Sequence, residues 1–410
     1  MFPSQTETYL LTDPAFLEDP YPVYRRMRQQ DPVYWSDALG HWVLTRYDDV
    51  LAATRNPALS SATTEAFVRA QLRGSDPALA ADLTRVSTGM MLLKDGQEHH
   101  RLRVLGNHAF TPSALGRWQS LIERVVDDLL DVALPCGRMD LIGDLARPLP
   151  AIVIAELFGI PPADREMFHQ WSMESARFGG GAVGDPEVAA RAANEAFLRQ
   201  EHYFRDLLEE RWRRPGDDLM SLLLKGQAEG RLTAAEVCSQ CILLLIAGHI
   251  TTMDQLGNTV MALLKNPQQM GRLREDPSLV RSAVEEGLRY DGAVQLRQRI
   301  AREYLVLRGQ TIRKGDLLYL SLGAANRDPE VFPEPDRFFV GRADNRHLAF
   351  GAGPHLCLGM TLARRELEVA LGRLVQRLPR LRFDAERPVR RRADSLLFRG
   401  LESLPVRFDS

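Results

Sequence analysis

The stretch Phe350-Gly351-Ala352-Gly353-Pro354-His355-Leu356-Cys357-Leu358-Gly359 places one cysteine between a glycine-rich loop and an expected helix over 360–378. A helix N-terminus carries free N–H groups and partial positive charge, which favour a thiolate over a thiol. The glycines let the backbone approach closely and can point amides at the sulfur. We therefore expect this loop to hold a cysteine anion.

Three uses of that anion can be compared from the residues around it. A nucleophile would need a neighbouring base, and His355 is close, but no further partner for a triad is evident. Zinc would need more cysteine or histidine ligands, and this segment holds none. An axial ligand to a haem iron needs one cysteine and one only, and fits the pattern.

The composition is that of an ordinary folded globular protein. Among 410 residues, 52 basic and 54 acidic side chains give a net charge of -2, and 45% of residues are apolar. This balance gives no reason to expect a nucleic-acid partner. Four cysteines rule out a disulfide scaffold, and neither a secretory signal nor a membrane-spanning apolar run is evident. We expect a cytoplasmic protein with no membrane partner, and one domain over 1–410.

The periodicity predicts a mostly α fold with small sheets near both ends. Helices are expected over 21–30, 115–134 and 186–214. Strands are expected over 33–35 and 42–45 as an early hairpin, and over 304–307 and 316–320 as a later set with turns at 308–309 and 314–315.

A further helix is unusually long. Thr233 and Glu236 form a capping box, and the helical pattern continues to Lys265. Thirty-two residues span roughly 48 Å, which crosses an entire domain. Gly248 in its interior costs about 1 kcal/mol relative to alanine. It therefore marks either a close helix crossing or a functional site.

The chain resembles the cytochrome P450 family. Its cysteine loop matches the family pattern Phe-Gly-x-Gly-x-His-x-Cys-x-Gly completely, and Glu286-Gly287-Leu288-Arg289 matches the family's Glu-x-x-Arg helix upstream. The resemblance implies one large, mainly α domain with haem b buried between the long central helix and the helix after the loop. Cys357 would ligate the iron, and the residues implied to surround the haem are Phe350, Gly351, Gly359 and Ala247.

The resemblance also assigns the charged residues near the haem. Glu286 and Arg289 would join Arg337, which lies in the segment Phe332-Pro333-Glu334-Pro335-Asp336-Arg337-Phe338, in a structural cluster. Propionates need cationic or N–H partners when partly buried. The residues implied to bind them are His99, Arg103, Arg299 and His355.

The long helix carries the residues that the resemblance places beside bound dioxygen, called here the oxygen-side residues. Its segment Ala247-Gly248-His249-Ile250-Thr251-Thr252 resembles the family's Ala-Gly-x-(Asp/Glu)-Thr-Thr. By resemblance, Ala247 and Gly248 leave room for dioxygen, and the Thr251 hydroxyl helps a proton reach it. The segment departs from the family at Ile250, which replaces the acid.

Three explanations of Ile250 stay open. His249 or Asp254 could relay protons, or the substrate could supply a polar group. The reaction could also depend less on a relay, as in desaturation or oxidative coupling.

The function implied is a bacterial haem-thiolate monooxygenase that inserts one oxygen atom from O2 into a mid-sized, mostly apolar natural product. The pocket's polar contacts would be Arg297 and His249. Oxidative coupling or desaturation is the alternative reaction, and a silent module that binds haem or a carrier protein is the alternative class. A separate ferredoxin or flavodoxin with its reductase would supply electrons, with Arg364 and Arg365 as docking charges. A carrier protein is a further candidate partner.

Overall fold

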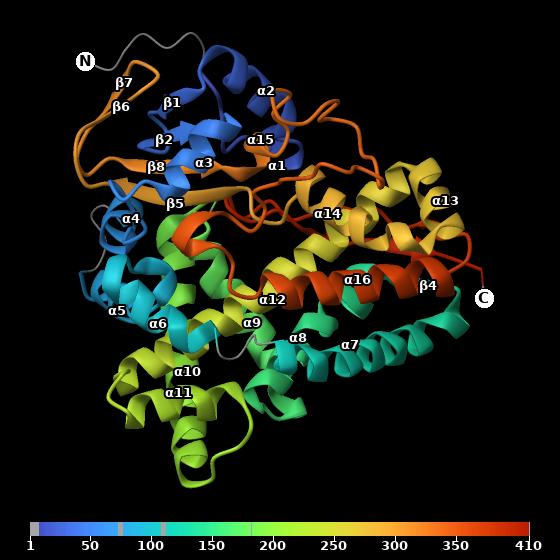
Figure 1. Cartoon of the computed structure of the whole chain (residues 1–410), viewed down its shortest axis with the longest axis horizontal. Helices are drawn as coiled ribbons and strands as arrows, with labels where there is room; N and C mark the ends of the chain where they lie inside the picture. Colours follow the sequence, from blue (N-terminus) through green and yellow to red (C-terminus); the bar gives the residue numbers. More distant parts are fainter. Residues whose placement is uncertain (1–7, 73–76, 108–111, 182, 410) are drawn as a thin grey trace.

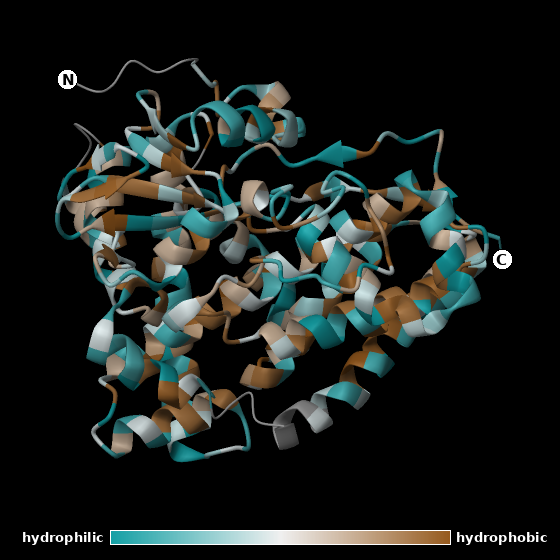
Figure 2. Cartoon of the chain, turned by 45° about the horizontal axis from the view of Figure 1, so that its top comes forward, coloured by the Kyte–Doolittle hydropathy of each residue, from teal (hydrophilic) through white to brown (hydrophobic). Residues whose placement is uncertain are grey.

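The computed structural model describes residues 8–72, 77–107, 112–181 and 183–409. The prediction that no secretory signal is present concerns N-terminal residues that lie largely outside these described ranges. Helices make up most of the molecule, and the largest sheet lies at one side of it (Figure 1). Hydrophobic segments follow the strands of this sheet and the inner faces of several helices (Figure 2).

The largest sheet joins strands from both ends of the chain in the order β1-β2-β8-β5-β3. All pairs are antiparallel except β2 with β8. Every residue of β8 is buried, as a central strand requires. Because β2 pairs with β8, the expected early hairpin and the 316–320 strand belong to one sheet rather than two. These strands are β1 (Val33–Ser36), β2 (His41–Leu44), β3 (Leu59–Ser60), β5 (Leu296–Ala301) and β8 (Leu317–Ser321).

Three smaller sheets complete the β-structure. The expected strand over 304–307 forms a hairpin with residues 310–312, not with 316–320, and Arg308 and Gly309 at its turn have φ values of 48° and 79°. The strands are β4 (Arg138–Asp140), β12 (Pro405–Arg407) and β9 (Arg382–Phe383) in the first sheet, β10 (Arg390–Arg391) and β11 (Leu401–Ser403) in the second, and β6 (Leu305–Leu307) and β7 (Gln310–Ile312) in the third.

The helices agree closely with the sequence pattern. The expected helices over 21–30, 115–134 and 186–214 correspond to α2, α7 and α10, with ends that differ by at most three residues. The α-helices are α1 (Pro14–Glu18), α2 (Tyr21–Gln30), α3 (Tyr47–Arg55), α4 (Thr64–Gln71), α5 (Pro77–Thr88), α6 (Gly96–Asn107), α7 (Pro112–Ala133), α8 (Pro148–Phe158), α9 (Arg165–Gly179), α10 (Pro186–Arg213), α11 (Leu219–Ala228), α12 (Ala234–Lys265), α13 (Pro267–Glu275), α14 (Val280–Tyr290), α15 (Leu322–Ala325) and α16 (Met360–Arg377). The short 3-10 and π segments are η1 (Met91–Leu93), η3 (Leu134–Cys136), η4 (Ile142–Ala146), η5 (Pro162–Asp164), η6 (Pro277–Leu279) and η7 (Gly353–His355).

Helix α12 runs through the centre of the molecule beside α16 (Figure 1). Its capping box is present: the Glu236 amide donates to the Thr233 hydroxyl over 3.2 Å, and the Thr233 amide donates to the Glu236 carboxylate over 2.9 Å. Contrary to the sequence expectation, α12 is long and apolar enough to cross a membrane, but its apolar window is 61% buried among other elements. It is therefore a core helix.

Gly248 lies where α12 crosses α8. A Cβ on Gly248 would come within 3.0 Å of Ile154 Cδ1. The close helix crossing that the sequence offered as one explanation of Gly248 is therefore present. Gly248 itself stays partly exposed beside the exposed Ala247, and its role in leaving room for dioxygen remains a prediction.

Candidate functional site

The cysteine loop is tightly folded back onto itself. The Cys357 amide donates to the Phe350 carbonyl over 2.9 Å. Gly351 and Gly353 have φ values of 71° and 70°, which side-chain-bearing residues rarely adopt. At Gly353 a Cβ would also meet the Thr54 carbonyl oxygen at 2.8 Å. The loop therefore needs these glycines to present Cys357 directly before α16.

The surroundings of the Cys357 sulfur act on its charge in opposite directions. Burial raises the pKa of the thiol, whereas the Arg297 guanidinium, the Gly359 N–H and the Arg103 guanidinium lower it. Three arginines, Arg364 being the third, and one amide thus favour the anion, but burial outweighs them and the pKa of the thiol stays above its ordinary value. Such a sulfur suits a bond to a metal ion, which supplies the missing positive charge.

Histidine and arginine side chains from three distant segments gather near this sulfur. The His99 ring on α6 lies 4.1 Å from the His355 ring of the cysteine loop, centroid to centroid. The His355 Nε2 lies 3.7 Å from the carboxylate of Asp95. Burial lowers the pKa of His99 to about 4 and of Arg299, on β5, to about 10. The sequence-predicted propionate ligands are thus brought together.

The cluster fits the carboxylates of a haem. Burial lowers the pKa of the Arg103 guanidinium, and the Arg299 guanidinium donates to the backbone carbonyl of Gln298 over 2.7 Å. In the described part of the chain, neither arginine has a carboxylate partner. Buried cations of this kind require anions. No group of three or more His, Cys, Asp or Glu side chains that could hold a metal ion occurs among the described residues, so the zinc alternative gains no support.

Of the oxygen-side residues, Ala247 and Thr251 lie on one face of α12. The Thr251 hydroxyl donates to the Ala247 carbonyl over 2.8 Å, and Thr251 is partly exposed. Ala247 is exposed although α12 is a core helix, so this face borders open space inside the molecule. Thr252 beside it is buried.

The two expected proton-relay residues, His249 and Asp254, both contact other buried side chains. His249 is two positions from Thr251, a turn of about 200° around the helix, and its Nε2 lies 3.3 Å from Nδ1 of His169 on α9. Burial, with His169 nearby, lowers the pKa of His249 to about 3. The Asp254 carboxylate accepts a 2.6 Å bond from Arg392 in a buried ion pair. Both side chains thus have buried partners, their role in proton relay remains a prediction, and Ile250 is buried in the apolar core.

The buried cluster on α14 forms with a different arginine from the expected one. Arg289 donates two 2.8 Å bonds to Glu286, and both side chains are fully buried. The third member is Arg342, which donates to Glu286 over 3.0 Å. The Arg337 guanidinium instead pairs with Glu334 at the surface, because the chain turns outward there, and only its backbone carbonyl accepts from Arg289. The prediction for Arg337 was wrong.

Two further acidic residues near α16, Glu285 and Glu366, were not predicted from the sequence. Arg364 on α16 donates to Glu285 over 2.7 and 2.8 Å and stacks 4.7 Å from the Phe350 ring centroid. It ties the cysteine loop to α14 rather than offering a free docking charge. Arg365 pairs with Glu368 over 3.1 Å and stays half exposed. Glu366 is buried, and burial raises its pKa to about 8.

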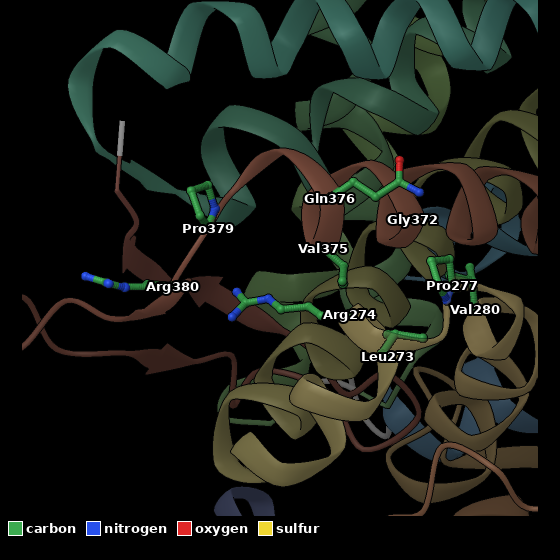
Figure 3. Close-up of a pocket in the computed structure, with 9 residues that line it drawn as sticks. All are labelled: Leu273, Arg274, Pro277, Val280, Gly372, Val375, Gln376, Pro379 and Arg380. Atoms are coloured by element: carbon green, nitrogen blue, oxygen red, sulfur yellow. The ribbon is translucent and has the colours of Figure 1, made fainter.

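A surface groove elsewhere on the molecule contains none of these residues. It lies between α13 and α16 (Figure 3), and its lining residues are Leu273, Arg274, Pro277, Val280, Gly372, Val375, Gln376, Pro379 and Arg380. Cys357 precedes the opposite, N-terminal end of α16. The groove therefore lies apart from the cysteine site.

Known proteins share this arrangement over the whole chain. The Cytochrome P450 family model matches residues 190–394. The biotin biosynthesis cytochrome P450 of Bacillus subtilis (strain 168) is 39% identical over 403 residues, which is 96% of this chain and 97% of that protein. The 6-deoxyerythronolide B hydroxylase of Saccharopolyspora erythraea is 36% identical over 97% of this chain and 98% of that protein. The crystal structure of P450BioI in complex with hexadec-9Z-enoic acid ligated acyl carrier protein matches with a TM-score of 0.89 and 38% identity, covering 98% of this chain and 100% of that one.

Proposed function

Because the chain belongs to the cytochrome P450 family, whose members are haem b monooxygenases, we propose that it inserts one oxygen atom from O2 into a mid-sized, mostly apolar natural product. The observation that carries the proposal is the Cys357 loop, whose glycines at positive φ present a single cysteine directly before α16, beside the predicted propionate ligands. The hydroxylase among the relatives favours oxygen insertion over coupling or desaturation. A silent binding module would not need the Thr251 hydroxyl, which this chain keeps.

Each residue of the site has a proposed task toward the haem. Cys357 would ligate the haem iron, with the Gly359 N–H favouring its negative charge and Phe350 and Gly351 shaping the loop. His99, Arg103, Arg299 and His355 would bind the haem propionates. When bound, the haem would supply the chemistry of O2 activation, which a thiolate ligand favours. Glu286, Arg289 and Arg342 hold the supporting helix.

Proton delivery is proposed to run through Thr251. Its hydroxyl donates to the Ala247 carbonyl, which leaves its oxygen lone pairs free to accept a proton donor from the open side of α12. His249 and Asp254 are engaged elsewhere, and Ile250 has no proton to give. We infer that a polar group of the substrate, or water that it positions, takes the place of the missing acid.

Family members use small-molecule substrates and redox partners. We propose that a separate ferredoxin or flavodoxin, with its reductase, docks on the Cys357 side and supplies two electrons. The solved complex of P450BioI with an acyl carrier protein supports a carrier protein as a second partner. We further propose a cytoplasmic location and a single functional domain over 1–410.

Turnover under isotopically labelled O2 tests the reaction type. The purified holoenzyme would first be screened by optical titration for compounds that shift the haem spin state. A bound compound is then turned over with a surrogate ferredoxin and reductase. The proposal predicts one labelled oxygen atom in the product, whereas an unlabelled coupled or desaturated product would overturn it.

A further inference from the structure

Arg297 favours the Cys357 thiolate through its charge, but it is not among the residues proposed to bind the haem propionates. It lies on β5, two residues before Arg299, so both side chains leave the strand on the same face. Their register partners on β8 are Leu320 and Leu318, which pack in an apolar cluster that also contacts Ala352 of the cysteine loop. The Arg297 face of the sheet is therefore the face toward the cysteine loop.

The other face of β5 faces a different part of the molecule. Gln298 donates to the Tyr319 hydroxyl over 3.4 Å, and Leu296 packs with Tyr319 in a separate cluster. Consistently, the charges that influence Arg297 and its neighbour come from the site: the Cys357 sulfur acts on Arg297, and Arg297 lowers the pKa of Arg299. Arg297 thus lies inside the site with its charge close to the reacting centre.

No carboxylate contacts Arg297 among the residues that the structure describes, although burial lowers its pKa. Three of the buried arginines elsewhere in the described part of the chain each pair with a carboxylate. Arg289 meets Glu286 at 2.8 Å, Arg392 meets Asp254 at 2.6 Å, and Arg399 meets Asp291 at 2.6 Å. Burying an unpaired cation of this kind costs free energy. We therefore expect Arg297 to pair with an anion that the chain does not supply.

The negative charges of a bound haem and its cysteine ligand would be balanced without Arg297. The two haem propionates match the two guanidinium groups of Arg103 and Arg299, and the Cys357 thiolate offsets the single positive charge of a ferric porphyrin. Asp95 is already bonded to Arg302 at 2.8 Å and lies beside His355. Arg297 therefore remains as one positive charge in excess.

We propose that Arg297 binds a carboxylate of the substrate, so that the pocket selects apolar acids over their neutral counterparts. This inference rests on the proposed function and deepens it by naming the substrate class. The planar guanidinium can hold a carboxylate through two parallel N–H bonds. The apolar remainder of the substrate would then extend along the open face of α12 that carries Ala247 and Thr251.

Optical titration of the ferric holoenzyme with matched acid and ester pairs tests the proposal. The probes are dodecanoic, hexadecanoic and abietic acid, each beside its methyl ester. In the wild type, at least one acid should shift the haem spin state with a Kd about 10-fold below that of its ester. Arg297→Gln should raise the Kd of that acid about 10- to 100-fold, which is the contribution of a charge-assisted hydrogen bond. The Kd of the ester should stay unchanged. Arg297→Lys should recover part of the loss.

Two control variants separate this role from the others. Arg299→Gln should lower haem retention more than Arg297→Gln does, and each titration is read per mole of bound haem so that acid and ester binding are compared on loaded protein alone. Arg281→Gln, at an exposed arginine on α14, should leave both titrations unchanged. The inference is overturned if no acid binds more tightly than its ester, if Arg297→Gln weakens acid and ester equally, or if it loses haem as Arg299→Gln does. A wild type without haem would instead overturn the proposed function.

Discussion

Glu366 shows how strongly the core of this protein acts on a single side chain. It is 3% exposed, and its Oε2 atom has no hydrogen-bond partner among the described residues. Burial raises its pKa from 4.5 to about 8, so the folded protein keeps a proton that the unfolded chain releases. The free energy of unfolding should therefore fall as pH rises from about 4.5 to about 8.

Glu366→Gln should remove this pH dependence. The amide cannot ionise, so the variant should gain stability over the wild type at pH 8 and little at pH 5. The gain should reach a few kcal/mol, since one pKa unit corresponds to about 1.4 kcal/mol. Thermal unfolding of both holoproteins at the two pH values measures it. Glu275→Gln, at an exposed position of α13, is the control, and equal melting shifts at both pH values would contradict the account.

Thr251 is the residue on which proton delivery is proposed to depend. Thr251→Ala should raise the fraction of consumed O2 that is released as peroxide several-fold, because no hydroxyl remains beside the Ala247 carbonyl. Thr251→Ser keeps the hydroxyl and should stay close to the wild type. Peroxide yield per O2 consumed, with a bound substrate, measures both. An unchanged yield in Thr251→Ala would show that protons arrive by another route.

At the scale of elements, the sequence predicted the helices better than the strands. The capping box and continuous apolar pattern set α12 to within its observed ends. Strand β5 was not predicted, because Arg297 and Arg299 occupy one of its faces and remove the hydrophobic alternation that marks a strand. The residues that serve the site thus obscured the element that positions them.

The cluster on α14 shows a second limit of sequence reasoning. The Glu-x-x-Arg spacing places Glu286 and Arg289 on one helix face, and this pair was predicted correctly. Which later arginine completes the cluster depends on the path of the loop after α15. That path turns Arg337 toward the surface and returns Arg342 to Glu286. Motif spacing holds no information about such a turn.

Arg342→Ala and Arg337→Ala should therefore differ in stability. Loss of Arg342 leaves the buried Glu286 with one cation fewer and should cost about 2–4 kcal/mol. Loss of Arg337 removes an exposed ion pair with Glu334 and should cost less than about 1 kcal/mol. Melting of the two holoproteins in parallel measures the difference. Equal destabilisation, or the reverse order, would contradict the assignment of Arg342.

At the scale of the whole molecule, the site depends on segments far apart in the chain. His99 comes from α6, Arg299 from β5 and His355 from the cysteine loop, and the main sheet brings the early strands beside the late ones (Figure 1). The resemblance carried by the loop motif predicted the fold class and the haem family. It could not predict that His249 and Asp254 are taken up by His169 and Arg392, because those contacts exist only after folding.

The central claim is that Cys357 ligates the haem iron as a thiolate. The most direct test is the absorption spectrum of the reduced, CO-bound protein, recorded for the wild type and for Cys357→His. The account predicts the long-wavelength band of a thiolate-ligated haem in the wild type and a shift to the shorter wavelength of an imidazole-ligated haem in the variant. Identical spectra for the two proteins, or no haem bound by the wild type, would contradict it.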